Sequence, residues 1–170
     1  MTDRGFHHVA FACRDIDATQ HFYQELMGYP LVHTEVKHID GGMFRHVFYA
    51  LEDGSAIAFF DMHGAGEAPG WDTAISTGNG LPVWVNHVAF GATSEKQEMV
   101  RGAMAADGIE PLMELDHGWC HSLYFLDPNG IMVELCRDTP GLSADAEEAV
   151  SRLHSDVETD RSRAIIARPT

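Results

Sequence analysis

The sequence predicts an α+β fold, in which two similar βαβββ modules pair around a shared cleft and a C-terminal helix follows. The first observation is a repeat: Phe6-His7-His8-Val9-Ala10-Phe11 near the start is matched by Val85-Asn86-His87-Val88-Ala89-Phe90 beyond the middle. The second is that each copy continues into a helix-like segment and then into three strand-like runs. Because a four-stranded sheet with one helix leaves one face uncovered, the two copies are expected to pair, within one chain or across a dimer.

The first module is expected over residues 5–62. Its first strand is followed by Asp15, a favourable N-cap for a helix that carries an apolar stripe and stops at Gly28. Two glycine-containing turns, Asp40-Gly41-Gly42 and Glu52-Asp53-Gly54, separate the three strands that come next. The expected elements are a strand at 6–13, a helix at 16–27 and strands at 30–38, 43–51 and 55–62.

The rest of the chain is divided in the same way. A linker rich in glycine is expected over 63–82, and a connection of this length in a compact domain usually joins modules or carries function. The second module is then expected over 83–137, and a C-terminal helix and tail over 138–170. The expected elements are strands at 84–91, 109–116, 119–126 and 131–136, a helix at 95–107, and an acidic amphipathic helix at 142–157 before a loosely held charged tail.

Composition narrows the class of protein. The 170 residues carry a formal net charge of -15, which repels phosphate backbones, so no nucleic-acid partner is expected. No apolar run approaches the roughly 20 residues that cross a bilayer, and the N-terminus lacks a signal-peptide pattern, so we expect a cytoplasmic protein without a membrane partner. The three cysteines show no paired spacing and are expected to be reduced.

Two histidines and one glutamate form a candidate metal site. With a period of two along each strand, His8 and His87 occupy equivalent positions of the repeat. Glu134 lies inside the apolar run Ile131-Met132-Val133-Glu134-Leu135, where an unpaired carboxylate would cost several kcal/mol. Each residue alone is compatible with a hydrogen-bonded core histidine or a glutamate paired with arginine. Together they match a two-histidine, one-carboxylate site with about three open positions, which is typical of Fe(II).

These residues resemble the vicinal oxygen chelate superfamily, which includes glyoxalases, fosfomycin- and bleomycin-resistance proteins and extradiol dioxygenases. The resemblance covers about residues 5–137 and implies a metal held between paired modules by His8, His87 and Glu134. It implies Fe(II), with Mn, Zn or Ni as alternatives, and a homodimer. Glyoxalase chemistry needs a second carboxylate, and the aligned position here is Ala58, which cannot bind a metal.

A narrower resemblance runs from His117 through Tyr124 and Asp127-Pro128-Asn129-Gly130 to Glu134. It is similar to the extradiol dioxygenase pattern, in which the spacing of His117 and Tyr124 is the discriminating part. Leu115 departs from the pattern, which has a smaller or β-branched residue or asparagine there.

Such chemistry needs an acid–base group, and histidine titrates in the right range. The candidates are His117 and His46, and Tyr124 is expected to hydrogen-bond a substrate oxygen. Each is also compatible with an ordinary structural role. His121 ranks lower because its strand parity is opposite to that of Tyr124. His117 is seven residues from Tyr124, so it reaches the same face only from the preceding loop, which Gly118 permits.

The first functional hypothesis is therefore an extradiol ring-cleaving dioxygenase that acts on a catechol-like small molecule. The alternatives are a glyoxalase- or fosfomycin-resistance-type lyase, transferase or isomerase, and a non-enzymatic binding protein of the bleomycin-resistance kind. The expected cleft residues indicate an aromatic or apolar ligand; they are Phe6, Phe48, Val85 and Met132.

Overall fold

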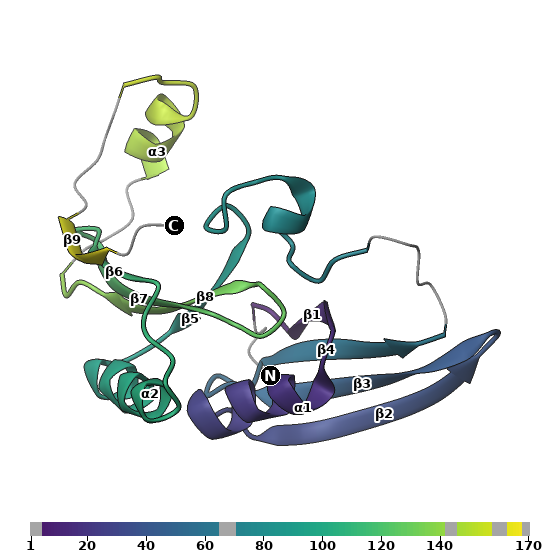
Figure 1. Cartoon of the computed structure of the whole chain (residues 1–170). Helices are drawn as coiled ribbons and strands as arrows, with labels where there is room; N and C mark the ends of the chain where they lie inside the picture. Colours follow the sequence, from purple (N-terminus) through teal and green to yellow (C-terminus); the bar gives the residue numbers. More distant parts are fainter. Residues whose placement is uncertain (1–4, 65–70, 142–145, 158–162, 168–170) are drawn as a thin grey trace.

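The strands of the first half form a four-stranded sheet. A computed structural model describes residues 5–64, 71–141, 146–157 and 163–167 (Figure 1). The strand order is β1-β4-β3-β2, with β1 parallel to β4 and the other neighbours antiparallel. Its strands are β1 (His8–Cys13), β2 (Leu31–Ile39), β3 (Gly42–Ala50) and β4 (Ala56–His63).

The second half repeats this plan. Its sheet has the order β5-β8-β7-β6-β9, and β5 runs parallel to β8 as β1 runs parallel to β4. The two-module α+β fold predicted from the repeat is confirmed. Its strands are β5 (His87–Gly91), β6 (Met113–Asp116), β7 (Cys120–Leu126), β8 (Met132–Asp138) and β9 (Arg163–Ala167).

One helix covers the same face of each sheet (Figure 1). In the first module α1 (Ile16–Gln20) continues into a π-helical segment, η1 (His21–Leu26). The predicted cap is confirmed, since Asp15 accepts hydrogen bonds from two backbone N–H groups of the first turn, both at 3.0 Å. In the second module α2 (Ser94–Ala106) begins after Thr93, whose hydroxyl caps it in the same way.

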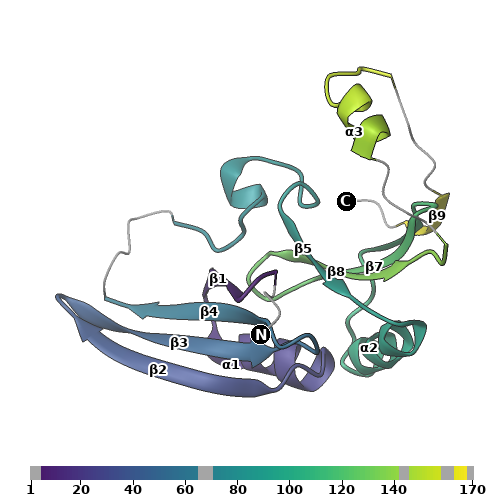
Figure 2. The same cartoon turned by 180° about the vertical axis from the view of Figure 1, so that it is seen from behind.

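The C-terminal part differs from the prediction in two respects. The tail is not wholly loose, because β9 pairs antiparallel with β6 and covers backbone groups that would otherwise form an open sheet edge. The helix α3 (Ala146–Arg152) is shorter than expected, and residues 142–145 lie outside the described part. Its apolar side chains do not pack on the sheets: Val150 and Leu153 are 74% and 73% exposed, and α3 stands apart in Figures 1 and 2.

A single apolar core joins the two modules on the helix side of both sheets. It includes Tyr49 and Phe59 from the first sheet and Leu123 and Phe125 from the second. The linker contributes one short 3-10 turn, η2 (Thr77–Asn79). No helix of the described residues is long and apolar enough to cross a membrane.

The turn between β7 and β8 fastens the second module to the first. Asp127 accepts a hydrogen bond from the hydroxyl of Tyr23 at 3.0 Å, and Asn129 Oδ1 accepts one from the backbone N–H of Arg14 at 3.1 Å. Gly130 lies against Ala74 of the linker. The Asp-Pro-Asn-Gly motif therefore has a structural role, because its polar atoms bridge segments that are about a hundred residues apart in sequence.

Candidate metal centre

His87 and Glu134 are brought together by the parallel pairing of β5 with β8. The register places Ala89 opposite Glu134, and the Nε2 atom of His87 lies 3.1 Å from Oε2 of Glu134. The other ring nitrogen, Nδ1, lies 2.8 Å from the carbonyl oxygen of Trp84. Because a carbonyl oxygen only accepts, Nδ1 carries the hydrogen, and Nε2 faces the carboxylate with either a proton or a lone pair. This is the arrangement of a metal-ligating histidine, which donates its second nitrogen to a carbonyl or carboxylate.

The carboxylate of Glu134 is buried and contacts polar side chains on the face of the sheet opposite the core. Glu134 is 5% exposed, and its strand neighbours Val133 and Leu135 point into the core. Oε1 accepts a short hydrogen bond from the hydroxyl of Ser122 on β7. Ser122 did not figure among the predicted site residues, although it lies two residues from Tyr124 and therefore shares its strand face.

His8 lies on the open face of the first sheet, opposite the helix. Its ring centroid is 5.3 Å from that of Phe48 and 6.0 Å from that of His46. The register of β1 with β4 places Ala10 opposite Ala58, which matches the pairing of Ala89 with Glu134 in the second sheet. Ala58 therefore occupies the position predicted from the repeat, where a second carboxylate would be needed for glyoxalase chemistry.

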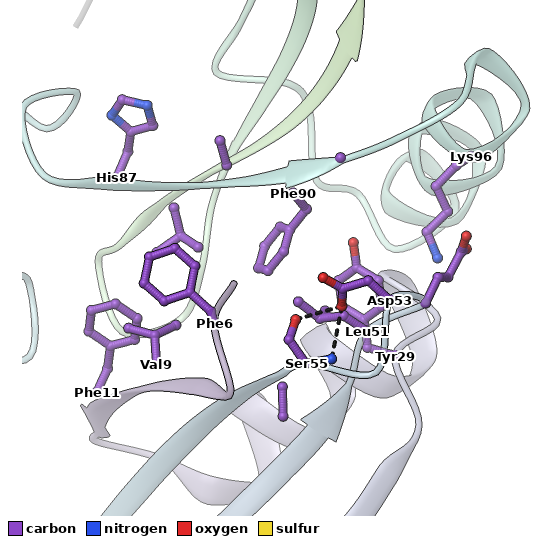
Figure 3. A pocket seen from close by; sticks show the side chains of 15 residues that line it. Phe6, Val9, Phe11, Tyr29, Leu51, Asp53, Ser55, His87, Phe90 and Lys96 are labelled. Atoms are coloured by element: carbon purple, nitrogen blue, oxygen red, sulfur yellow. Dashed lines mark hydrogen bonds between the residues drawn. The ribbon is translucent and has the colours of Figure 1, made fainter. Parts of the chain in front are cut away.

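A cavity of about 520 Å³ separates β1 from β5 and is lined by both modules. In Figure 3, Val9 and Phe11 extend into this cavity from β1 and Phe90 extends into it from β5. The ring of His87 leaves β5 on the other side of the strand. His8 alternates with Val9, so it also leaves its strand on the side away from the cavity. The shared cavity thus holds apolar side chains of both halves, and the two histidine rings lie on its outer sides.

His117 lies in the turn between β6 and β7, as its spacing from Tyr124 required. Gly118 has φ +81°, which supplies the left-handed turn. Nε2 of His117 lies 3.0 Å from the hydroxyl of Tyr124, which is paired with Glu134 in the β7–β8 register. Burial, together with the charge of Glu134, raises the pKa of Tyr124, so its hydroxyl stays protonated near neutral pH.

The other two histidine candidates, His46 and His121, do not contact His87, Glu134 or Tyr124. His46 is on the first sheet, stacked on Phe60 with ring centroids 3.8 Å apart, and its buried Nε2 atom has no hydrogen-bond partner. Burial, reinforced by the positive charge of His8, lowers the pKa of His46. His121 lies on the opposite strand face from Tyr124, 3.4 Å from Glu114, as the parity argument predicted.

Cys120 also joins the site and was not predicted to do so. Within the described residues, one set of three candidate ligand atoms lies within 4.8 Å of one another, and it comes from His117, Cys120 and Glu134. Neither His8 nor His87 belongs to this set. The sequence indicated the role of Cys120 only weakly. Cys120 is four residues from Tyr124, and it shares the strand face of Tyr124 only if the regular strand already begins at Cys120.

Comparison with known protein families agrees with this architecture. Residues 5–135 match the model of the Glyoxalase/Bleomycin resistance protein/Dioxygenase superfamily. The chain belongs to this superfamily. One relative of this chain is a protein of Arabidopsis thaliana named Glyoxylase I 4. The two are 28% identical over 136 residues, which are 76% of this chain and 68% of the relative.

Solved structures of the superfamily share the fold. A glyoxylase/bleomycin resistance protein/dioxygenase domain from Frankia sp. EAN1pec has a TM-score of 0.62 at 18% identity, with 83% of this chain and 96% of that chain covered. The fosfomycin resistance protein FosX from Listeria monocytogenes has a TM-score of 0.55 at 20% identity, with coverage of 82% and 97%. FosX has also been solved with Mn(II) and sulfate. Superfamily members are mostly metal-dependent enzymes that act on small molecules.

Proposed function

We propose that this protein is a metal-dependent extradiol dioxygenase, which cleaves the ring of a catechol-like substrate beside its two hydroxyl groups. The observation that carries the proposal is the 3.0 Å contact between His117 and Tyr124, beside the contact of His87 with Glu134. An acid–base histidine that is hydrogen-bonded to a tyrosine, next to candidate metal ligands, suits a reaction in which a diol must lose protons.

The donor set fits a divalent ion such as Fe(II). His87 would hold it through Nε2 and Glu134 through its carboxylate, with His8 as the third ligand. When bound, the ion would supply a Lewis acid that favours ionisation of the substrate hydroxyls. The hydrogen bond from His87 to Trp84 and the hydrogen bond from Ser122 to Glu134 would fix both ligands before the ion arrives.

The remaining side chains handle protons and substrate orientation. His117 would accept the proton of a substrate hydroxyl at Nε2 and return it later in the reaction. Tyr124, whose pKa is raised, keeps its hydrogen and can donate it to a substrate oxygen.

His8 would come from a partner subunit in a homodimer. The support is that the ring of His87 leaves β5 on the side away from the cavity. By the alternation along β1, His8 also leaves its strand away from that cavity. Mixing His8→Ala chains with His87→Ala chains tests this. If the ligands are shared between subunits, each mixed dimer contains one intact site and activity returns. No recovery, in mixtures shown to exchange subunits, contradicts the shared site.

The activity itself is tested with purified protein loaded anaerobically with Fe(II). Catechol and 2,3-dihydroxybiphenyl are the probes, and oxygen uptake is followed together with the coloured ring-opened product. We expect one oxygen consumed per product formed. Stoichiometric iron without oxygen uptake on either probe would remove the dioxygenase proposal.

The second candidate is a fosfomycin-resistance-type reaction. It is favoured by the absence of a second carboxylate at Ala58, since that reaction type uses the same three-ligand arrangement, and by the likeness to FosX. Loss of fosfomycin with the Mn(II)-loaded protein, and no oxygen uptake with iron, would favour this candidate. The retained ligand types argue against a binding protein without a metal.

A further inference from the structure

The set formed by His117, Cys120 and Glu134 has the composition of a site for a thiophilic metal. All three ligand atoms lie within 4.8 Å of one another. Cys120 is 0% exposed and Glu134 is 5% exposed, so two of the donors are removed from water. Burying the carboxylate of Glu134 beside the thiol of Cys120 is costly. A cation bound between them would satisfy both groups.

The fold holds these donors on one face from three separate segments. Cys120 begins β7, Glu134 lies on the adjacent strand β8, and His117 extends from the turn that precedes β7. The turn is closed by the backbone N–H of His117, which donates to the carbonyl oxygen of Cys120 at 2.9 Å. The Sγ atom of Cys120 lies 3.4 Å from the hydroxyl of Ser122, which also bonds Glu134.

We propose that His117, Cys120 and Glu134 bind a thiophilic divalent ion such as Zn²⁺, in a site that one chain forms alone. Sulfur, imidazole and carboxylate are the ligand types of zinc, and three protein ligands leave one tetrahedral position open to water. Cys120 binds as thiolate, so its thiol proton is released to solvent when the ion enters. The ligand set differs from His8, His87 and Glu134 in its sulfur donor and in needing no second subunit.

This site competes with the proposed catalytic site because both use Glu134. A zinc ion held by Cys120 would also occupy His117, the proposed acid–base group. Zn²⁺ is therefore expected to inhibit the iron-loaded enzyme. The binding itself does not depend on the dioxygenase proposal, and it can be measured without any substrate.

Cobalt substitution provides the test, because a thiolate bound to Co²⁺ gives a charge-transfer band in the near ultraviolet that imidazole and carboxylate ligands do not give. The reduced, metal-free full chain is titrated anaerobically with Co²⁺. We expect one equivalent per chain to produce the band and added Zn²⁺ to abolish it. Cys120→Ser should lose the band, and His117→Ala should weaken cobalt binding by at least about 10-fold.

Two variants serve as controls. Cys136→Ser removes the thiol of β8 that interacts with Cys120 and should keep the band, as should His8→Ala. His8→Ala also separates the two proposals, since it should abolish iron-dependent activity while the cobalt band remains. A wild-type chain without the band, or a band that persists in well-folded Cys120→Ser and Cys120→Ala proteins, would overturn the zinc site.

Discussion

Nε2 of His87 faces Oε2 of Glu134 at 3.1 Å, while Nδ1 of the same ring is committed to the carbonyl oxygen of Trp84 at 2.8 Å. An imidazole lone pair and a carboxylate at this distance repel each other unless a cation lies between them or the ring is protonated. The arrangement of His87 and Glu134 therefore favours a bound cation or a protonated ring. This relationship connects the strand pairing of β5 and β8 directly to the chemistry proposed for the site.

His87→Ala should weaken binding of divalent iron by at least about 100-fold, because loss of a direct ligand exceeds the loss caused by an outer hydrogen-bond partner. Metal content after dialysis measures this, and circular dichroism checks the fold. His63→Ala is the matched control, since His63 pairs with Asp61 at 2.8 Å on the other sheet. Full iron occupancy in His87→Ala would refute its role as a ligand.

His117→Ala should keep the iron and lower turnover by at least about 100-fold, the usual effect of removing a positioned acid–base group. Tyr124→Phe should lower turnover less, because it removes one hydrogen bond and no titrating group. Steady-state kinetics on the iron-loaded proteins provide the measurement. His121→Ala, on the opposite strand face, should behave as wild type. An unchanged rate in His117→Ala would exclude it from the mechanism.

Gly130→Ala should destabilise the fold more than Gly108→Ala. Both glycines have positive φ, +77° and +78°, so each substitution costs about 1–2 kcal/mol in backbone strain. A Cβ atom at Gly130 would lie 2.6 Å from Cβ of Ala74, whereas one at Gly108 meets nothing within 4 Å. The clash should add about 1–3 kcal/mol. Urea unfolding of both variants compares them, and equal losses would contradict the close packing.

His46 should make the metal-free protein less stable in mild acid. Its folded-state pKa is lowered, first by burial and then by the charge of His8, so the unfolded chain binds more protons as pH falls through about 6.5. The stability that depends on neutral His46 is present above that pH and is lost below it. His46→Phe should therefore lose less stability than wild type between about pH 7.5 and about pH 5.5. Urea midpoints in the presence of a chelator measure the difference, and parallel losses would argue against the lowered pKa.

Much of the architecture could be predicted because it depends on local patterns. The repeat around His8 and His87, the capping residue Asp15 and the glycine-containing turns act over a few residues, and the structure has strands and helices where they indicate. The alternation of side chains along a strand also predicted that Ala58 aligns with Glu134 and that His117 must lie in a turn. These inferences succeeded because a period of two fixes the face of every residue in a regular strand.

The amino-acid sequence was sufficient to predict the modules, the strand faces and the residue types of a candidate metal site. Which of those residues meet depends on tertiary packing. It joined His87 to Glu134, added Ser122 and Cys120, placed His46 beside His8 on the other sheet, and paired β9 with the edge of β6. The physical reason is that alternation gives a side chain's face but not the packing of one sheet against another, which depends on the shared apolar core and on the turn at Asp127.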